Sequence, residues 1–387
     1  MIRGAVAALA VAGALAAPGT LDPAFGHDGT SLTYLSKTAL GRPLLMPAPA
    51  GGLALLGLGR LDGHAFVARY DRDGRLVRGF ARGGVARATG FVGLEAWGAA
   101  RPLPGGDLLV AGRQQVNIFN EYVLLARFLP DGKLDPHFGL RGRARQRFGP
   151  KGCTESTPAA ALTQGTKTVL AVSSCSRLSG FIAVAIARVT SAGRVDRSFG
   201  THGVTFLEPI QGNSLPESLG RQRDGKILVG IGGDEGSAAV ARLLPNGRPD
   251  PTFRRHGYIT FHRGPETRLD PVSGVFQLAD GSILAVACLR FAEPVLYHLS
   301  ARGVVIGSTP VPAVDGCLKS PVQVGDDVVG ASSDAVVRLS PDGSVAWSAP
   351  FPGVAAVLLE PGNRVVAAAP AQLGAGRYGY ELRRYGA

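Results

Sequence analysis

The apolar residues of the chain fall in short runs that turn residues separate, and this pattern occurs seven times. In each copy a turn, usually rich in Gly or Asp, leads into a short apolar run. The copies are GGLALLG from Gly51, GGDLLVAG from Gly105, TKTVLAV from Thr166, DGKILVG from Asp224, DGSILAV from Asp280, DDVVGA from Asp326 and GNRVVAA from Gly362. These runs are too short for helices and follow hairpin-type turns, so each predicts a β-strand.

A second repeated phrase is an apolar strand that ends in a cationic residue before a turn, as in ARFLPDGKL from Ala126. The cationic residues of its seven copies are Arg69, Arg127, Arg188, Arg242, His298, Arg338 and Arg384. Successive copies stand 40 to 61 residues apart, which is typical of propeller blades. The two phrases predict an all-β fold, a seven-bladed β-propeller with four short strands in each blade. In blade 2 these strands are expected near residues 96–101, 108–112, 122–128 and 143–148.

The second phrase continues beyond its turn in the early copies. A Phe follows eleven residues after the Arg in four copies: Phe80, Phe138, Phe199 and Phe253. An Asp follows eight residues after it in three: Asp135, Asp196 and Asp250. Since a charged pair that recurs in blade after blade is more typical of a framework than of a ligand site, we expect each Asp to pair with its Arg. Blades 5 and 6 skip this continuation.

The seventh copy is cut off by the chain end, and the N-terminal region holds the missing part. In GTLDPAFGHDG, Asp22 and Phe25 stand where the seventh copy lacks its Asp and Phe. We therefore predict that residues 19–35 supply the outermost strand of the last blade and pair Asp22 with Arg384. Such a closure removes the open edges of the ring.

The phrase ARFLPDGKLDPHFG resembles the repeats of the delta-60 repeat family of bacterial β-propellers. The resemblance extends over essentially the whole chain after the first residues. The copies at Ala126, Ala187 and Ala241 are close, whereas Val77 stands where the family has Asp and the fifth and sixth copies are degenerate. The resemblance implies a propeller fold and export, and it implies no defined activity.

The composition agrees with one ring of short strands, because 55 Gly and 27 Pro accompany 45% hydrophobic residues in 387. The start, MIRGAVAALAVAGALAAPG, has one cation, an apolar stretch and a small-x-small site at residues 14–16. We interpret residues 1–16 as a secretory signal peptide and residues 17–387 as a single propeller domain, secreted or in the cell envelope. No later segment approaches the roughly 20 apolar residues of a membrane helix.

Four cysteines allow two disulfides in three pairings, and the lack of a C-x-x-C motif argues against zinc or thioredoxin-type chemistry. Cys153 and Cys175 fall at the same end of neighbouring strands in blade 3, which favours a bond between them. A Cys288–Cys317 bond between blades 5 and 6 then follows by elimination.

The formal net charge of +12 is concentrated in part after the repeat Phe. The strongest group, which we call the basic rim, comprises Arg141, Arg143, Arg145, Arg147, Arg254 and Arg255. Such a rim would attract an anionic cell-envelope polymer or glycan. A nucleic-acid partner is not expected in an exported protein without a recognition motif. The alternative is that charges on outer strands only prevent edge-to-edge aggregation.

Carboxylates recur eleven residues before the second turn position of four first phrases: Glu95, Glu155, Asp270 and Asp315. In blade 4 this position is Ser214. Equivalent positions form a ring near the start of the innermost strands, where clustered carboxylates could bind calcium or a cationic ligand, or serve acid–base chemistry. The alternative is that each one caps its own turn.

No G-x-S-x-G, H-E-x-x-H or P-loop motif occurs. The sequence therefore favours a monomeric, non-enzymatic binding or scaffold propeller, with calcium as the one cofactor considered and no metal assigned. The alternative function is a polymer-acting enzyme, a glycan lyase or hydrolase, that uses the four carboxylates at the channel mouth.

Overall fold

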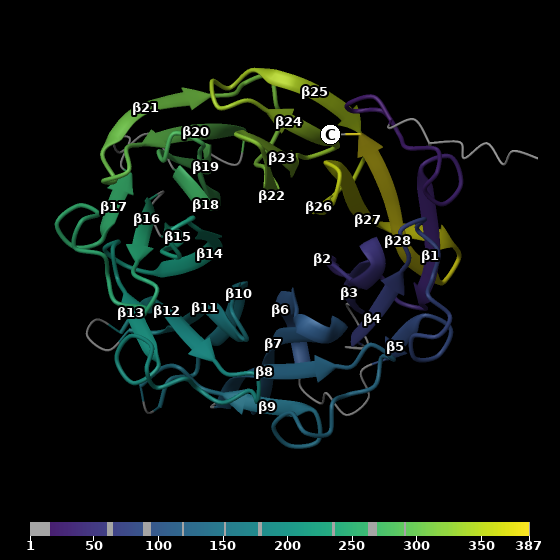
Figure 1. Ribbon diagram of the computed structural model, residues 1–387, viewed down its shortest axis with the longest axis horizontal. Coiled ribbons are helices and arrows are strands. Elements are labelled where there is room, and N and C mark those ends of the chain that lie inside the picture. The colour runs from purple at the N-terminus through teal and green to yellow at the C-terminus, as the bar shows by residue number, and fades with distance from the viewer. Residues whose placement is uncertain are drawn as a thin grey trace, which may run out of the picture.

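Seven four-stranded antiparallel sheets are arranged as a ring, which confirms the predicted seven-bladed β-propeller (Figure 1). The computed structural model describes residues 16–59, 65–87, 94–117, 120–150, 152–176, 180–233, 237–261, 269–289 and 292–386, with only the backbone of residues 94–97, 120, 269 and 270. In these ranges the helical elements are two short 3-10 turns, Pro49–Gly51 and Pro104–Gly106. The predicted signal peptide lies outside them, except for its last residue.

Each blade runs from an innermost strand at the central opening to an outermost strand at the edge (Figure 1). Blade 1 contains β2 (Leu44–Pro47), β3 (Leu53–Leu58), β4 (Ala65–Tyr70) and β5 (Val85–Arg87). Blade 2 contains β6 (Leu94–Pro102), β7 (Leu108–Asn117), β8 (Asn120–Phe128) and β9 (Arg143–Gln146). Blade 3 contains β10 (Ser156–Gln164), β11 (Lys167–Cys175), β12 (Ile182–Val189) and β13 (Val204–Leu207). Blade 4 contains β14 (Ser214–Arg221), β15 (Ile227–Gly233), β16 (Ala238–Leu243) and β17 (Tyr258–Phe261).

The remaining blades follow the same order. Blade 5 contains β18 (Leu269–Gln277), β19 (Ile283–Leu289), β20 (Glu293–Leu299) and β21 (Val305–Pro310). Blade 6 contains β22 (Lys319–Val324), β23 (Asp327–Ala331), β24 (Ala335–Leu339) and β25 (Val345–Pro350). Blade 7 contains β26 (Ala356–Glu360), β27 (Arg364–Gly374), β28 (Arg377–Gly386) and, from the N-terminal region, β1 (Thr30–Ser36).

The core lies between blades rather than inside one sheet. The cluster between blades 2 and 3, for example, joins Val123 and Leu125 to Leu170 and Val172. Because neighbouring blades cover both faces of a middle strand, these strands are almost continuously apolar instead of alternating. This explains why the sequence shows compact apolar runs such as LLVAG.

The N-terminal strand closes the ring as predicted. Strand β1 pairs antiparallel with β28, with Thr30 opposite Arg383. Asp22 and Arg384 form a buried ion pair, with 2.9 Å between Oδ2 and Nη2. The guanidinium of Arg384 also stacks on the Phe25 ring, 4.8 Å from its centroid. Residues from both ends of the chain therefore complete blade 7 (Figure 1).

The other predicted ion pairs form as well. Arg188 and Asp196 are 2.7 Å apart, and Arg242 and Asp250 are 2.8 Å apart. Arg127 lies 3.4 Å from Asp135. Its Nε donates a closer hydrogen bond, of 2.7 Å, to Asp107, so in blade 2 the Arg is shared between two carboxylates.

The repeat Arg also donates hydrogen bonds to the next blade, which the spacing within one repeat did not predict. Arg69 donates to the carbonyl of Pro130 at 3.0 Å, and Arg127 donates to the carbonyl of Ser191 at 3.2 Å. In blade 4, Arg242 donates to the carbonyl of Ala301. Each guanidinium thus joins its own blade to the turn of the following one.

The repeat Phe completes this contact by packing on the turn glycine of the next blade. A Cβ on Gly74 would lie 2.7 Å from the Phe25 ring, and one on Gly193 would lie 2.6 Å from the Phe138 ring. Glycine is therefore required there by the close approach of the ring as well as by its positive φ. We call the Arg, Asp, Phe and turn Gly of one junction the junction frame.

Blades 5 and 6 lack the Asp and Phe, as expected, and use simpler contacts. His298 Nε2 lies 2.7 Å from the carbonyl oxygen of Pro341 in the next turn. Arg338 pairs with Asp327 of the neighbouring strand at 2.8 Å. In blade 2, β7 extends to Asn117, beyond the predicted end at residue 112, because its hairpin with β8 continues past the sheet core.

Candidate functional site

The basic rim lies at the outer edge of blades 2 and 4. Arg141 precedes β9, Arg143 and Arg145 belong to it, and Arg254 and Arg255 precede β17. In an up-and-down blade, the connection between strands three and four lies on the same face of the ring as that between strands one and two. We call this the turn face.

The rim arginines of blade 2 are supported by polar and aromatic neighbours. Arg145 donates from Nε to the side-chain oxygen of Gln114 at 2.8 Å. The Arg147 guanidinium lies 4.8 Å from the centre of the Tyr122 ring. Arg143 is half-buried, whereas Arg141 and Arg145 are exposed. The guanidinium groups are thus held along one strand edge where solvent reaches them.

A hollow of about 580 Å³ surrounds the exposed edge of β9. Four arginines line it: Arg141, Arg143, Arg145 and, from the turn of blade 3, Arg194. No Asp or Glu is among the described residues that line it. The charged residues among the described lining of this hollow are therefore all cationic.

Two rim arginines occupy backbone positions that favour glycine. Arg254 has φ 53°, and the equivalent position after the repeat Phe is Gly26, Gly139 or Gly200 in three other blades. Arg141 has φ 52°. A left-handed conformation at a residue with a Cβ costs about 1 kcal/mol. Ala81 of blade 1 and, at the position of Arg141, Asp28 and His202 have the same left-handed backbone, so this conformation belongs to the turn of the repeat and not to the arginines.

The four predicted carboxylates are only partly described. Asp315 is exposed and Glu155 is half-buried, whereas the side chains of Glu95 and Asp270 lie outside the described residues. In the described part of the chain, no three His, Cys, Asp or Glu side chains gather to hold a metal ion. The carboxylate ring, with calcium or catalysis, stays a prediction.

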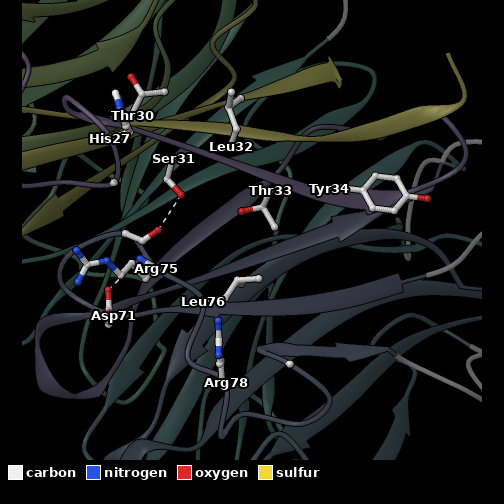
Figure 2. A pocket seen from close by; sticks show the side chains of 13 residues that line it. His27, Thr30, Ser31, Leu32, Thr33, Tyr34, Asp71, Arg75, Leu76 and Arg78 are labelled. Atoms are coloured by element: carbon white, nitrogen blue, oxygen red, sulfur yellow. Dashed lines mark hydrogen bonds between the residues drawn. The ribbon is translucent and has the colours of Figure 1, made fainter. Parts of the chain in front are cut away.

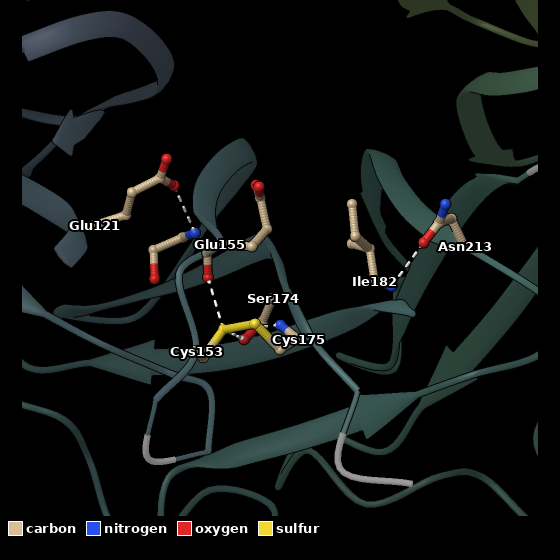
Figure 3. The surroundings of a disulfide bond; sticks show 8 residues. Glu121, Cys153, Glu155, Ser174, Cys175, Ile182 and Asn213 are labelled. Atoms are coloured by element: carbon tan, nitrogen blue, oxygen red, sulfur yellow. Dashed lines mark hydrogen bonds between the residues drawn. A yellow bond between two sulfur atoms is a disulfide. The ribbon is translucent and has the colours of Figure 1, made fainter. Parts of the chain in front are cut away.

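Both predicted disulfides are present, Cys153–Cys175 and Cys288–Cys317. Figure 3 shows Glu155 beside the first of them, with Glu121 accepting a hydrogen bond from the backbone N–H of Ser156 at 3.2 Å. Two disulfides are compatible with an oxidising compartment. No helix in the ranges described above is long and apolar enough to cross a membrane.

The central opening contains a second candidate site, which the sequence did not indicate. A cavity of about 660 Å³ is lined by residues at or next to six innermost strands, and its charged residues are Arg42, Glu217 and Lys319. Glu217 lies at an irregularity of β14, between Pro216 and Ser218. Blades 2 and 3 have Gly98 and Ala159 at the same irregularity of their innermost strands.

Burial raises the pKa of Glu217 to about 7, against the opposing influence of Arg42. The count of eleven residues had assigned Ser214 to this ring and so passed over Glu217. An alignment of the innermost strands on their β-bulges would have found it. At this position Glu217 is a carboxylate, whereas Gly98 and Ala159 are small residues. The function of a repeat protein is more readily sought at such departures from the repeat.

Comparisons with known proteins agree with the fold. A family model described as a beta-propeller domain of unknown function, DUF5122, matches residues 222–253, which include the second and third strands of blade 4 and its Asp and Phe. This supports a relationship to bacterial β-propellers. A comparison with curated protein sequences found no match.

Solved structures match over most of the chain at low identity. The structure described as "YCF48 bound to D1 peptide" has 12% identity and a TM-score of 0.53, over 96% of this chain and 100% of that one. A protein of unknown function from Dyadobacter fermentans has 12% identity and a TM-score of 0.47, over 92% and 99%. A PQQ-bound aldose sugar dehydrogenase from Streptomyces coelicolor has 14% identity and a TM-score of 0.46, over 80% and 97%. At this identity the likeness concerns the fold alone.

Proposed function

We propose that this protein is an exported, non-enzymatic binding propeller whose basic rim holds a polyanionic polymer of the cell envelope. The observation that carries the proposal is the hollow around β9, where four arginines and no described carboxylate face solvent. Membership of the delta-60 repeat family, with residues 1–16 as a signal peptide, is part of the proposal. The two disulfides support an extracytoplasmic location.

Arginine suits this role because its planar guanidinium presents several donors to phosphate, sulfate or carboxylate groups. A single exposed ion pair contributes only about 0–1 kcal/mol. A polymer that contacts several arginines of the rim in succession adds these contributions and releases counterions, so binding depends steeply on salt. Blade 4 adds two further exposed cations, Arg254 and Arg255, which directly follow its repeat Phe.

The experiment is salt elution of the mature protein from heparin and from a neutral dextran resin. We expect retention on heparin alone, with elution at moderate salt. A rim variant, Arg143→Thr with Arg145→Leu, removes two positive charges and should elute at clearly lower salt.

The matched control removes charge away from the rim. Lys37 is exposed just after β1, and Arg377 is exposed at the start of β28, both on the face opposite the turn face. The variant Lys37→Thr with Arg377→Thr should elute close to the wild type. Equal losses in the two variants, or no retention of the wild type, would overturn the proposal.

A further inference from the structure

The cavity in the central opening is separate from the basic rim and has an uneven distribution of charge. Strand β14, which carries Glu217, lies across the central opening from β2 (Figure 1). Arg42 stands two residues before the start of β2, and Lys319 begins β22. The cavity therefore has cations contributed by blades 1 and 6 and a carboxylate contributed by blade 4.

Arg42 is held in place by the neighbouring blades. Its Nε donates to the carbonyl of Ala355 in blade 7 at 2.9 Å, and its Nη2 donates to the Ser320 hydroxyl in blade 6 at 3.0 Å. The Cys288–Cys317 disulfide also lines the cavity and fixes the chain just before Lys319. One wall of the cavity thus has the Arg42 guanidinium held against the Ser320 hydroxyl, with Lys319 as a second cation in the lining.

Glu217 has a different environment. No described side chain or backbone group donates a hydrogen bond to its carboxylate, and its residue is half-buried. Burial raises its pKa to about 7, because the attraction of Arg42 does not compensate for the lost solvation. The two groups interact through the cavity without forming an ion pair, so each is available to a ligand.

The other charged groups near the opening are few. Lys319 is the remaining charged residue among the described lining. Glu95 on β6 and Asp270 on β18 lie on innermost strands as well, but only their backbone is described. An ammonium group beside Glu217 would restore a favourable partner to this carboxylate, and a carboxylate group would suit Arg42, Lys319 and Ser320.

We propose that the central cavity binds a small zwitterion, such as an amino acid or short peptide with free ends. Its carboxylate contacts Arg42, Lys319 and Ser320, and its ammonium contacts Glu217. The cavity volume of about 660 Å³ falls within the range of small-ligand sites. The ligand is small and lies in the ring, whereas the polymer of the proposed function lies at its outer edge.

The test is isothermal titration with 6-aminohexanoate, which has an amine and a carboxylate at opposite ends. Hexanoate and hexylamine are the matched probes that each retain one charge. The zwitterion should bind at least tenfold more tightly than either probe, as expected when a second charge-assisted contact forms. Equal affinities of hexanoate and 6-aminohexanoate, or no binding of the zwitterion, would overturn the proposal.

Two variants assign the ends of the ligand. Glu217→Gln keeps the shape of the side chain and should reduce affinity for 6-aminohexanoate about tenfold, to the level of hexanoate. Lys319→Gln should weaken both ligands together. The rim variant Arg254→Gly should bind as the wild type does, which separates this site from the rim. If Glu217→Gln leaves the preference for the zwitterion intact, the assignment is wrong.

The pH dependence gives a second readout. As the pH rises from about 6 to about 8, Glu217 loses its proton and the wild type should bind 6-aminohexanoate more tightly. The probe amine stays protonated in this range because alkylamines have pKa values near 10. Glu217→Gln should show no such increase. An increase of the same size in the variant would contradict the role of Glu217.

Discussion

Two junctions of the ring have the same frame but outermost strands of different polarity. At the junction of blades 7 and 1, Phe25 packs on Gly74, and at that of blades 2 and 3, Phe138 packs on Gly193. A hollow lies at each outer strand, of about 1170 Å³ at β1 and about 580 Å³ at β9, and the first is also lined by Asp71, Arg75 and Arg78. Figure 2 shows the first, with Thr30, Leu32 and Tyr34 along its strand.

The strand registers make the two hollows directly comparable. Thr30 pairs with Arg383 and Leu32 with Glu381, just as Arg143 pairs with Ala126 and Arg145 with Leu124. Blade 7 therefore has Thr and Leu where blade 2 has two arginines. Leu32 is 59% exposed, so folding tolerates an apolar residue at this position.

This difference bears on why the arginines are present. If charge were needed at every outer strand to prevent aggregation, blade 7 and blade 5 would have it too. Instead β1 exposes Leu32, and β21 exposes Ile306, which is 64% accessible. The charge is specific to certain blades, which is what a binding surface requires and what a general protective device does not.

The largest effect is expected from the shared frame. Phe25→Ala and Phe138→Ala should each lower the free energy of unfolding by about 3–5 kcal/mol, because each removes a fully buried ring at a junction. Urea denaturation measures both losses. Under conditions in which both variants stay folded, their elution from heparin should match the wild type. A small loss at one junction only would show that the two frames are not equivalent.

The second effect is a loss of stability in acid. Burial opposes ionisation of Asp196, but hydrogen bonds from Lys167, Ser198 and Arg188 outweigh it and hold the pKa of this carboxyl well below its usual range. Its contribution to stability is therefore complete above about pH 4 and is lost as the pH falls through the lower, folded pKa. Urea denaturation at several pH values should show this decline, and Asp196→Asn should show a shallower one.

The smallest effect concerns the positive φ of two rim arginines, and it separates their influence on stability from their influence on heparin binding. Arg141→Gly and Arg254→Gly should leave the free energy of unfolding unchanged or raise it by up to about 1 kcal/mol, since glycine relieves the positive φ. Both should nevertheless elute from heparin at lower salt. Destabilisation by either glycine would mean that the arginine side chain supports the fold instead.

The fold could be predicted from the sequence because the repeat recurs along the chain and its seventh copy is divided between the two ends. Asp22 and Phe25 complete the copy that contains Arg384, and the structure joins them as expected. The bond from Arg127 to Ser191 in the next blade was not predictable, because the repeat spacing describes one blade at a time. The hydrogen bond from Arg127 to Asp107 was not predictable either, because Asp107 belongs to the first repeated phrase and Arg127 to the second, and only the sheet brings them together.

Of the two candidate sites, one was indicated by the sequence and the other was not. Arg143 and Arg145 lie on the outermost strand of blade 2, where a strand was predicted at residues 143–148, whereas the rim as a binding surface stays a prediction. Glu217 escaped because it stands at an irregularity of β14, where one residue is left out of the strand pairing. Counting along the sequence cannot anticipate such a shift, and it led to Ser214 instead.

The most direct measurement exchanges the two surfaces while leaving both frames intact. Arg143→Thr with Arg145→Leu gives blade 2 the residues of blade 7, and Thr30→Arg with Leu32→Arg does the reverse. The salt dependence of heparin binding should become shallower in the first variant and steeper in the second, with unchanged free energies of unfolding. If the first variant binds heparin as the wild type does, the basic rim is not the binding surface.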